Sequence, residues 1–186
     1  MLVACTYFPY DNSMYSENKN LLISESMHED GPAITTEKRR NPNLANEDGS
    51  TPLQLICIES DDGDDEADYS ILEKFFEIID DRHEPLLIDA QDKSGNTPLH
   101  LALNRGCKKM VQLLLIRGAN SNLPNANGLT PLHITCRRYG DDDDLVKNFL
   151  ELSIAEHRPV QVDAVDNELG RTSLHHALLT SGVIQT

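Results

Sequence analysis

The sequence has few aromatic residues and few basic ones. Only 5% of its 186 residues are aromatic, and Trp does not occur. A core without large rings has to be built mainly from Leu, Ile, Val and Ala, which suits thin helical layers better than a sandwich or a ligand-binding barrel. Lys and Arg number 16 against 31 Asp and Glu, so the formal net charge is −15. Nucleic-acid affinity comes largely from Lys and Arg that neutralise phosphates, so we expect no nucleic-acid partner and, for the same reason, no anionic membrane surface.

The chain also lacks a long apolar run and a paired set of cysteines. No stretch approaches the roughly 20 apolar residues that span a bilayer. The four cysteines, at positions 5, 57, 107 and 136, show no paired spacing. Cys57 and Cys136 each follow a repeated Thr at a similar distance, where a small buried side chain is expected, so core thiols are favoured over a disulfide. We therefore predict a reducing, intracellular location, cytoplasmic with the nucleus as the alternative.

What the sequence does contain is a repeated four-residue word. Thr-Pro-Leu-His occurs at Thr97–His100 and at Thr130–His133, each time with a Gly two residues before the Thr, and those two glycines are 33 residues apart. Altered copies stand at Thr51–Gln54 and Thr172–His175. The successive glycine gaps of 46, 33 and 42 residues indicate that long repeats alternate with a short one. A word that recurs in this way is typical of a stack of repeats rather than of one globular core.

Each repeat can be interpreted as a turn followed by two short helices. Gly after Asp, Ser or Asn permits the positive φ of a tight turn. Thr then caps the first helix through its hydroxyl, and Pro at the first helical position loses no hydrogen bond. In the most regular repeat we expect the first helix to end at Asn104–Gly106 and the second at Arg117–Gly118. The second helix is predicted to bury one stripe, formed by Met110, Val111, Leu114 and Leu115.

The long repeats insert acidic residues between their two helices, at 61–68 and 141–144. The first of these runs does not fit an EF-hand loop, because Ile58 would then hold the first ligand position. A solvated turn is therefore favoured over loose binding of divalent cations.

After each acidic run a second helix is predicted, over Ile71–Ile79 and over Leu145–Ile154. Ser70 and Glu73 have the spacing of a capping box for the first of these helices. Asp144 is expected at the positive end of the other helix, where a carboxylate is favourable. Both helices are expected to stop at a His-x-Pro sequence.

These residues resemble the ankyrin repeat family, whose signature includes Thr-Pro-Leu-His-x-Ala at a 33-residue period. The resemblance covers roughly 41–186; Gln54 departs from it by replacing the motif His, and Ser173 by replacing the motif Pro. It implies an all-α solenoid of stacked helix-turn-helix units joined by β-turn loops. The repeats would lie at about 41–87, 88–119, 120–160 and, in part, 161–186, behind an irregular segment, 1–40.

The motif histidines are the first candidates for chemistry. His100, His133 and His175 recur once per repeat, and no Cys or carboxylate completes a zinc-like ligand set at short spacing. The resemblance implies that this His hydrogen-bonds neighbouring backbone, so a structural role is favoured. No nucleophile elbow, phosphate-binding glycine loop or His-Glu-x-x-His motif occurs. We therefore predict no catalytic residue, no cofactor and no metal.

The resemblance implies non-enzymatic recognition of a partner protein by a curved surface. Its contact positions would be solvent-facing loop tips and first-helix ends. In this sequence the matching positions are Gln91, Lys93, Ser94, Asn96, Asn104, Arg105, Pro124, Ala126, Leu129, Arg137 and Arg138. Two rival functions stay open. One is an acidic inhibitor of a basic transcription-factor surface, acting through the acidic runs, and the other is the substrate-recruiting arm of a larger enzyme.

The middle of the acidic chain is basic. Between Asp92 and Asp141 there is no Asp or Glu, whereas seven Lys and Arg lie there. Adjacent turns of opposite sign could compensate one another, each exposed pair contributing about 0.2–1 kcal/mol. Alternatively, the basic residues attract an acidic peptide through their long-range field.

The last repeat is predicted to leave an apolar layer exposed, because a terminal repeat needs a polar outer face and this one has several apolar residues. Such a layer would favour self-association. Its predicted residues are Leu178, Leu179, Val183 and Ile184.

Overall fold

The computed structural model describes residues 41–58, 65–83, 85–138, 143–156 and 159–180. The segment 1–40 lies outside these residues, so its predicted irregular structure stays a prediction. Within the described ranges the chain forms seven helices. They are α2 (Pro52–Ile58), α3 (Asp65–Arg82), α4 (Pro98–Arg105), α5 (Lys108–Ile116), α6 (Pro131–Arg137), α7 (Asp143–Ala155) and α8 (Ser173–Thr180).

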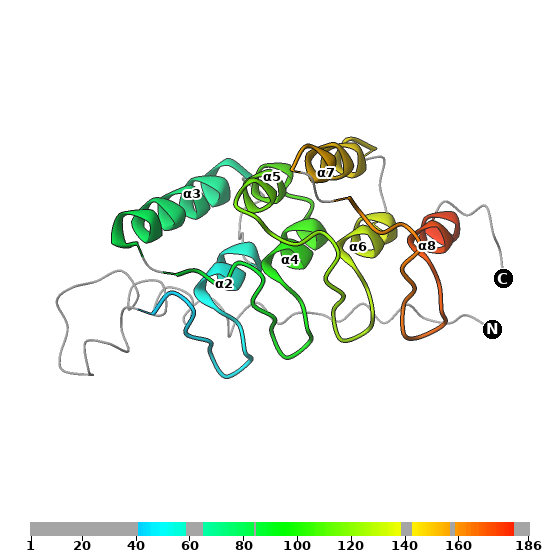
Figure 1. Ribbon diagram of the computed structural model, residues 1–186, viewed down its shortest axis with the longest axis horizontal. Coiled ribbons are helices and arrows are strands. Elements are labelled where there is room, and N and C mark those ends of the chain that lie inside the picture. Colours follow the sequence, from blue (N-terminus) through cyan, green and yellow to red (C-terminus); the bar gives the residue numbers. More distant parts are fainter. Residues whose placement is uncertain (1–40, 59–64, 84, 139–142, 157–158, 181–186) are drawn as a thin grey trace. The chain divides into compact units, whose positions relative to one another are not determined.

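The helices are arranged in two rows. One row holds α2, α4, α6 and α8, and the other holds α3, α5 and α7 (Figure 1). Neighbours within each row pack against each other, and α2, α4 and α6 each pack against the helix that follows them in the chain. A loop projects to the same side before each helix of the first row (Figure 1). The predicted all-α stack of helix pairs is therefore confirmed.

The pair α4 and α5 shows why the repeated word starts a helix. Thr97 is the N-cap of α4 and has extended backbone, with φ −86° and ψ 165°. Its hydroxyl accepts a hydrogen bond from the His100 amide, and the His100 ring accepts one from the Thr97 amide (3.2 Å), which closes a capping box. Pro98 takes the first helical position, and Gly106 ends the helix in the left-handed region at φ 83°.

The core lies between the two rows and between successive pairs. The predicted stripe of α5 is confirmed, because its four residues are at most 1% exposed. Leu99 and Leu103 of α4 are fully buried opposite this stripe, and Phe75, Phe76 and Phe149 fill the row of α3 and α7. Each pair is thin, so its leucines are covered only by the neighbouring pairs.

The helix α3 is longer than the sequence predicted. It begins at Asp65 rather than Ile71, so Ser70 lies inside the helix and the predicted capping box with Glu73 is wrong. Acidic residues stabilise the positive end of a helix, which lets α3 extend back into the acidic run. The first turn of α7 contains Asp144, as predicted.

The predicted stop of α3 is confirmed. The helix ends at Arg82, and the next residue, His83, has a positive φ of 55°. The corresponding His-x-Pro residues after α7, at 157 and 158, lie outside the described ranges. Across those ranges, no helix has both the length and the hydropathy needed to cross a membrane.

Candidate interaction surface

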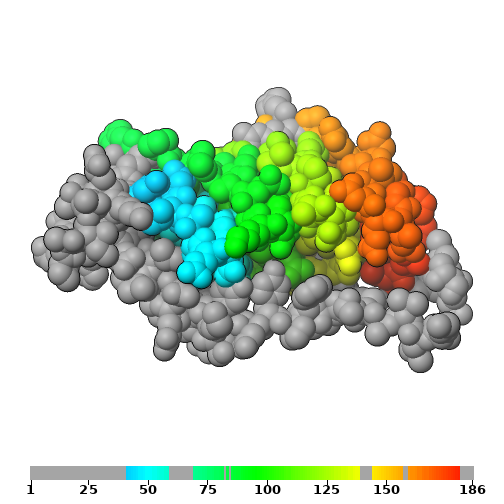
Figure 2. All heavy atoms as spheres, turned by 90° about the horizontal axis from the view of Figure 1, so that it is seen from below, coloured from blue at the N-terminus to red at the C-terminus, as the bar shows by residue number. Residues whose placement is uncertain are grey.

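The loops before the first-row helices are joined tip to tip by backbone hydrogen bonds. The Lys93 amide donates to the Asp48 carbonyl (3.2 Å). The Ala126 amide donates to the Ser94 carbonyl in the next loop (3.0 Å). The Asn167 amide continues the row by donating to the Asn127 carbonyl in the loop before it (2.9 Å). We call each loop, together with the helix or helix pair that follows it, a unit. Seen from the side of the tips, the successive units lie side by side in chain order (Figure 2).

Each loop is shaped by one Asn or Asp side chain. In the loop before α4, one Asp92 oxygen accepts from the amides of Ser94 (2.9 Å) and Asn96 (2.8 Å). Asn46 and Asn125 form the same pair of bonds in their own loops. Such Asx turns fix the backbone locally. The tips are therefore held both within each loop and between loops.

Two glycines permit the close approach of neighbouring loops. Gly95 and Gly128 have φ of 74° and 76°. A Cβ on Gly95 would lie 2.5 Å from the Ala126 amide nitrogen, and one on Gly128 would lie 2.7 Å from that of Asn167. Glycine alone meets both the dihedral and the spacing requirement at low energy.

Most of the predicted contact residues lie at the surface. The exposed ones are Gln91, Lys93, Ser94, Asn104, Pro124, Ala126 and Arg137, and the half-buried ones are Asn96, Arg105 and Arg138. Leu129 is different, because its side chain is only 5% exposed. The expectation that Leu129 faces solvent is therefore wrong. It directly precedes the N-cap Thr130, where the extended backbone turns its side chain into the core.

Some of these side chains hold adjacent units together. The side-chain nitrogen of Gln91, Nε2, donates to the backbone carbonyls of Gly95 (2.8 Å) and Pro124 (3.0 Å). Arg138 donates from Nη1 to the Asn104 carbonyl (2.8 Å). Their role as partner contacts stays a prediction, and these bonds give them a second role in the stack.

Part of the central basic charge is compensated by neighbouring units. Arg117 Nη1 lies 2.7 Å from Asp80 Oδ2, and its guanidinium carbon lies 4.5 Å from the centre of the Phe76 ring. Lys108 Nζ lies 3.8 Å from a carboxylate oxygen of Asp144. These pairs are largely solvent-exposed, so each contributes little to stability.

The motif histidines link each unit to the next. Nδ1 of His100 accepts from the amide of its own N-cap, so Nε2 carries the proton and donates to the Leu129 carbonyl (2.9 Å). Nε2 of His133 reaches the Arg171 carbonyl in the same way (3.1 Å). The predicted bonds from these rings to backbone are confirmed. Burial lowers the pKa of His100 and of His133, because the charged ring is poorly solvated there.

Gln54 performs the same task in the first unit. Its oxygen accepts from the Thr51 amide (2.8 Å), and its nitrogen donates to the Asn96 carbonyl (2.7 Å). The substitution of the motif His by Gln therefore keeps both bonds, because a side-chain amide offers one acceptor and one donor at a similar spacing.

In the last described unit, the side chains that face a following unit elsewhere in the stack are exposed to solvent. His175 accepts from the Thr172 amide (3.2 Å) as the other motif histidines do, yet its ring is exposed. Leu174 is 66% exposed, whereas Leu99 at the corresponding position of α4 is fully buried. Nothing among the described residues covers this end as a further unit would.

The predicted apolar layer at this end is placed differently by the structure. Leu178 and Leu179 are half-buried, and the other two predicted residues, Val183 and Ile184, lie outside the described ranges. The exposed apolar residue of α8 is Leu174, because it occupies the position that a following unit covers elsewhere in the stack.

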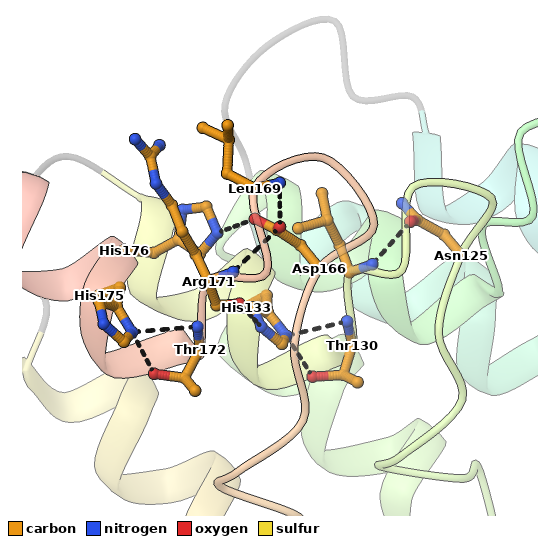
Figure 3. A network of polar contacts seen from close by, with 10 residues as sticks. Asn125, Thr130, His133, Asp166, Leu169, Arg171, Thr172, His175 and His176 are labelled. Atoms are coloured by element: carbon orange, nitrogen blue, oxygen red, sulfur yellow. Dashed lines mark hydrogen bonds and ion pairs between the residues drawn. The ribbon is translucent and has the colours of Figure 1, made fainter.

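Sequence reasoning missed one buried pair near the same end. The sequence marks His176 only as a neighbour of the motif His, but its Nε2 lies 2.8 Å from Oδ2 of Asp166. The two side chains are only 10% and 3% exposed. The His176 ring also meets the His133 ring edge-to-face, with centroids 5.5 Å apart (Figure 3). One signal in the sequence could have pointed to this pair. The residue that follows the motif His is apolar in α4 (Leu101) and in α6 (Ile134), but it is His176 in α8.

The carboxylate of Asp166 is held in its charged form. Its Oδ1 accepts from the amides of Leu169 (2.9 Å) and Arg171 (3.2 Å). Burial by itself would raise the pKa of Asp166, but these bonds and the neighbouring His176 outweigh burial and lower the pKa to about 2. Within the described part of the chain, no three His, Cys, Asp or Glu side chains cluster as a metal site would require.

Known proteins share this repeat. Residues 81–134 match the family described as ankyrin repeats in many copies. The human transient receptor potential cation channel subfamily A member 1 is 37% identical over 95 residues, which covers 51% of this chain and 8% of the channel subunit. Chicken inversin is 32% identical over 129 residues, covering 65% of this chain and 11% of inversin.

A third relative covers more of the chain at lower identity. The mouse B-cell lymphoma 3 protein homolog is 27% identical over 161 residues, covering 71% of this chain and 34% of that protein. The chain thus spans between a twelfth and a third of the length of these relatives. The repeated word, the stacked helix pairs and these similarities agree, and the chain belongs to the ankyrin repeat family.

Proposed function

We propose that this chain is a non-catalytic module that binds a partner protein through its row of loop tips and the C-terminal ends of α4 and α6. In this proposal 41–186 form one array of repeats behind the segment 1–40. Ankyrin repeats are in general binding modules without catalytic activity. The buried thiols of Cys57 and Cys107 suit a reducing location, cytoplasmic or nuclear.

The observation that supports this site is the row of backbone hydrogen bonds between the tips. These bonds fix the loops, while the side chains of Lys93, Ser94 and Ala126 remain exposed. A surface that is already ordered before binding loses little conformational entropy when a partner docks. His100 and His133 are engaged in holding the units together, so they are not part of the proposed contact surface.

A partner with an acidic segment suits this surface better than a basic one. Lys93 and Arg137 are exposed, whereas Lys108 and Arg117 already lie beside carboxylates of the chain. Attraction through exposed charges is screened by salt, so this binding would weaken as ionic strength rises. The rival function, inhibition of a basic surface through the acidic runs, depends on side chains that mostly lie outside the described residues.

Capture of partners by the intact chain tests the surface. One variant places glutamate on two tips, Ser94→Glu with Ala126→Glu, which should repel an acidic segment. The matched control makes the same change on the exposed side of the other row, Gln112→Glu with Asn148→Glu. We expect the tip variant to lose the partners that the wild type captures at low salt and releases at high salt, and the control to keep them. Retention of these partners by the tip variant, or their loss in the control, would contradict the proposed surface.

A second candidate is self-association through the end of α8, and the exposure of Leu174 favours it. Sedimentation equilibrium of the wild type and Leu174→Glu tests this possibility. We expect a dimer at high concentration that the substitution abolishes. A wild-type monomer at all concentrations would contradict it.

A further inference from the structure

The end of the stack at α8 repeats the surface that each earlier unit turns toward the next one. The Leu of the repeated word is Leu53 in α2, Leu99 in α4 and Leu132 in α6, and at most 5% of each side chain is exposed. Leu174 of α8 holds the same position and is 66% exposed. The earlier junctions therefore bury this Leu, whereas the last unit leaves it in contact with solvent.

The second-row helix beside this end is also incompletely covered. In α5 the four residues of the buried stripe are at most 1% exposed. The residues of α7 with the same spacing are Leu145, Val146, Phe149 and Leu150. Leu145 and Phe149 are buried, but Val146 and Leu150 are only half-buried. Both rows therefore end in apolar side chains that a further unit would cover.

One hydrogen-bond donor of the last unit lacks the acceptor that it has at the earlier junctions. Nε2 of His100 and of His133 donates to a backbone carbonyl of the next unit. Nδ1 of His175 accepts from the Thr172 amide, so its Nε2 also carries a proton (Figure 3). No acceptor for this proton lies among the described residues. The last unit thus offers a donor at the position where other units hold the next one.

Two acceptors are unused at the same end. In each earlier unit, the tip carbonyl directly before the Gly accepts an amide of the next loop, and in the last unit this carbonyl belongs to Leu169. Asp89 accepts the Asn120 amide at the start of the next unit (2.9 Å), and the corresponding carboxylate is that of the exposed Asp163. Among the described residues, neither Leu169 nor Asp163 has a donor for these oxygens. A Cβ on Gly170 would also meet nothing within 4 Å.

The first helix of the stack has no comparable open side. Six consecutive residues of α2, Pro52–Cys57, are buried, as are six consecutive residues of α4 inside the stack. An α-helix has about 3.6 residues per turn, so six residues point to every side of it. In α8, by contrast, Ser173 and His176 are the buried residues. A second copy of the chain that covers the end at α8 therefore has to offer its own α8 end.

We propose that two copies of this chain pair tail to tail, so that the α8 end of each copy covers the α8 end of the other. This inference rests on the self-association proposed above and gives it a geometry. The surface is self-complementary, because Nε2 of His175 is a donor and the oxygens of Leu169 and Asp163 are acceptors. Each His175 donates to an acceptor of the other copy, and Leu174 packs against its counterpart at the two-fold axis. Contact of like with like closes after two copies, so the product is a dimer and not a filament.

Net charge sets the salt dependence of this pair. The chain carries a formal charge of −15, so two copies repel each other, and salt screens that repulsion. We therefore expect the dimer to become tighter as the ionic strength rises. Binding of an acidic segment by the loop tips is expected to weaken under the same change. Partner capture is a separate readout, so either proposal can fail without the other.

Opposite charges at one position test the tail-to-tail geometry. Sedimentation equilibrium of the full chain should show that Leu174→Glu and Leu174→Lys each weaken the dimer about tenfold or more, because like charges meet at the axis. An equimolar mixture of the two variants should dimerise about tenfold more tightly than either alone, because a carboxylate then faces an ammonium group. In a head-to-tail contact position 174 faces a different surface, so mixing would gain nothing.

The outcomes separate this geometry from self-association in general. A wild-type dimer without recovery in the mixture, or assembly beyond a dimer, would refute the tail-to-tail pair and leave self-association standing. A wild type that stays monomeric at all concentrations would refute both. Leu87→Glu is the matched control, because Leu87 is 60% exposed and lies in another unit. It adds the same charge, and its dimer should match that of the wild type within about twofold.

An isosteric pair of substitutions tests the donor. Both His175→Gln and His175→Glu keep an acceptor for the Thr172 amide, as in a capping box, but only the glutamine keeps a donor. We expect the dimer of His175→Gln to resemble that of the wild type. The dimer of His175→Glu should be weaker by about fivefold for each of the two symmetry-related bonds. Equal affinities of the two variants would refute the assignment of His175 as the donor across the dimer contact.

Discussion

The substitution Gly95→Ala measures how much the contact between loop tips stabilises the stack. Two effects add at this position. With φ at 74°, an alanine adopts a left-handed backbone that L-residues disfavour by about 1–2 kcal/mol. Its Cβ would also lie 2.5 Å from the Ala126 amide nitrogen and 3.0 Å from the carbonyl carbon of Asn125. Backbone atoms cannot yield as a flexible side chain can, so the loops have to separate.

The separation has a calculable effect. It disrupts the bond from the Ala126 amide to the Ser94 carbonyl, now 3.0 Å, and loss of such a bond costs about 1 kcal/mol. Strain of the surrounding backbone adds about 1 kcal/mol or more. Together with the dihedral term, we expect Gly95→Ala to lower the free energy of unfolding by about 3–4 kcal/mol.

The chain offers its own graded controls. Gly170 has φ 63°, but a Cβ at this position would meet nothing within 4 Å, so Gly170→Ala should show the dihedral effect alone, about 1 kcal/mol. Gly49, with the Lys93 amide nitrogen at 3.1 Å, should fall between the two. Urea unfolding followed by circular dichroism gives the three free energies. Because the units of a repeat array can unfold separately, hydrogen exchange should locate each loss. Equal losses for Gly95→Ala and Gly170→Ala would refute the view that the tips stabilise one another.

Three further predictions concern the caps and the buried titratable groups. Ser173→Pro should stabilise the chain by about 1 kcal/mol, because it restores the Pro found at the start of α4 and α6 and removes a buried hydroxyl without a partner; a melting temperature that stays the same or falls would contradict this. His100→Gln should retain most of the stability in urea, since Gln54 already shows that an amide makes both bonds, whereas His100→Ala should lose about 2 kcal/mol; equal losses would argue against the two bonds. The folded-state pKa of Asp166, about 2, lies below its ordinary value of 3.8, so its stabilisation is present above about pH 4 and is lost as the pH falls toward 2. The free energy of unfolding of Asp166→Asn should therefore be about 2 kcal/mol below that of the wild type at neutral pH. In acid unfolding experiments the two values should converge as the pH falls toward 2.

The histidines that link the units add a second component to the pH dependence of the free energy of unfolding. The pKa of His100 and of His133 is lowered by burial, and both rings are neutral in the folded chain. Their contribution is complete above their ordinary pKa of 6.5 and is lost as the pH falls below it.

The sequence by itself determined the parts of the fold that depend on neighbours a few residues away. The cap at Thr97, the proline start of α4, the stop at Gly106 and the stripe of α5 could all be predicted. Each follows from a hydrogen bond or a dihedral preference within one or two helical turns. The repeat period then indicated the fold class, because thin two-helix units of one kind can bury their leucines only by stacking.

The tertiary structure decided what depends on residues far apart in the chain. The burial of Leu129 and the pairing of Lys108 with Asp144 arise only when one unit lies against the next. His176 and Asp166 meet because a loop folds back over its helix, and nothing in their spacing shows which oxygen or ring nitrogen is free to pair. Such contacts depend on the position of whole units relative to each other, which a local pattern of residues does not encode.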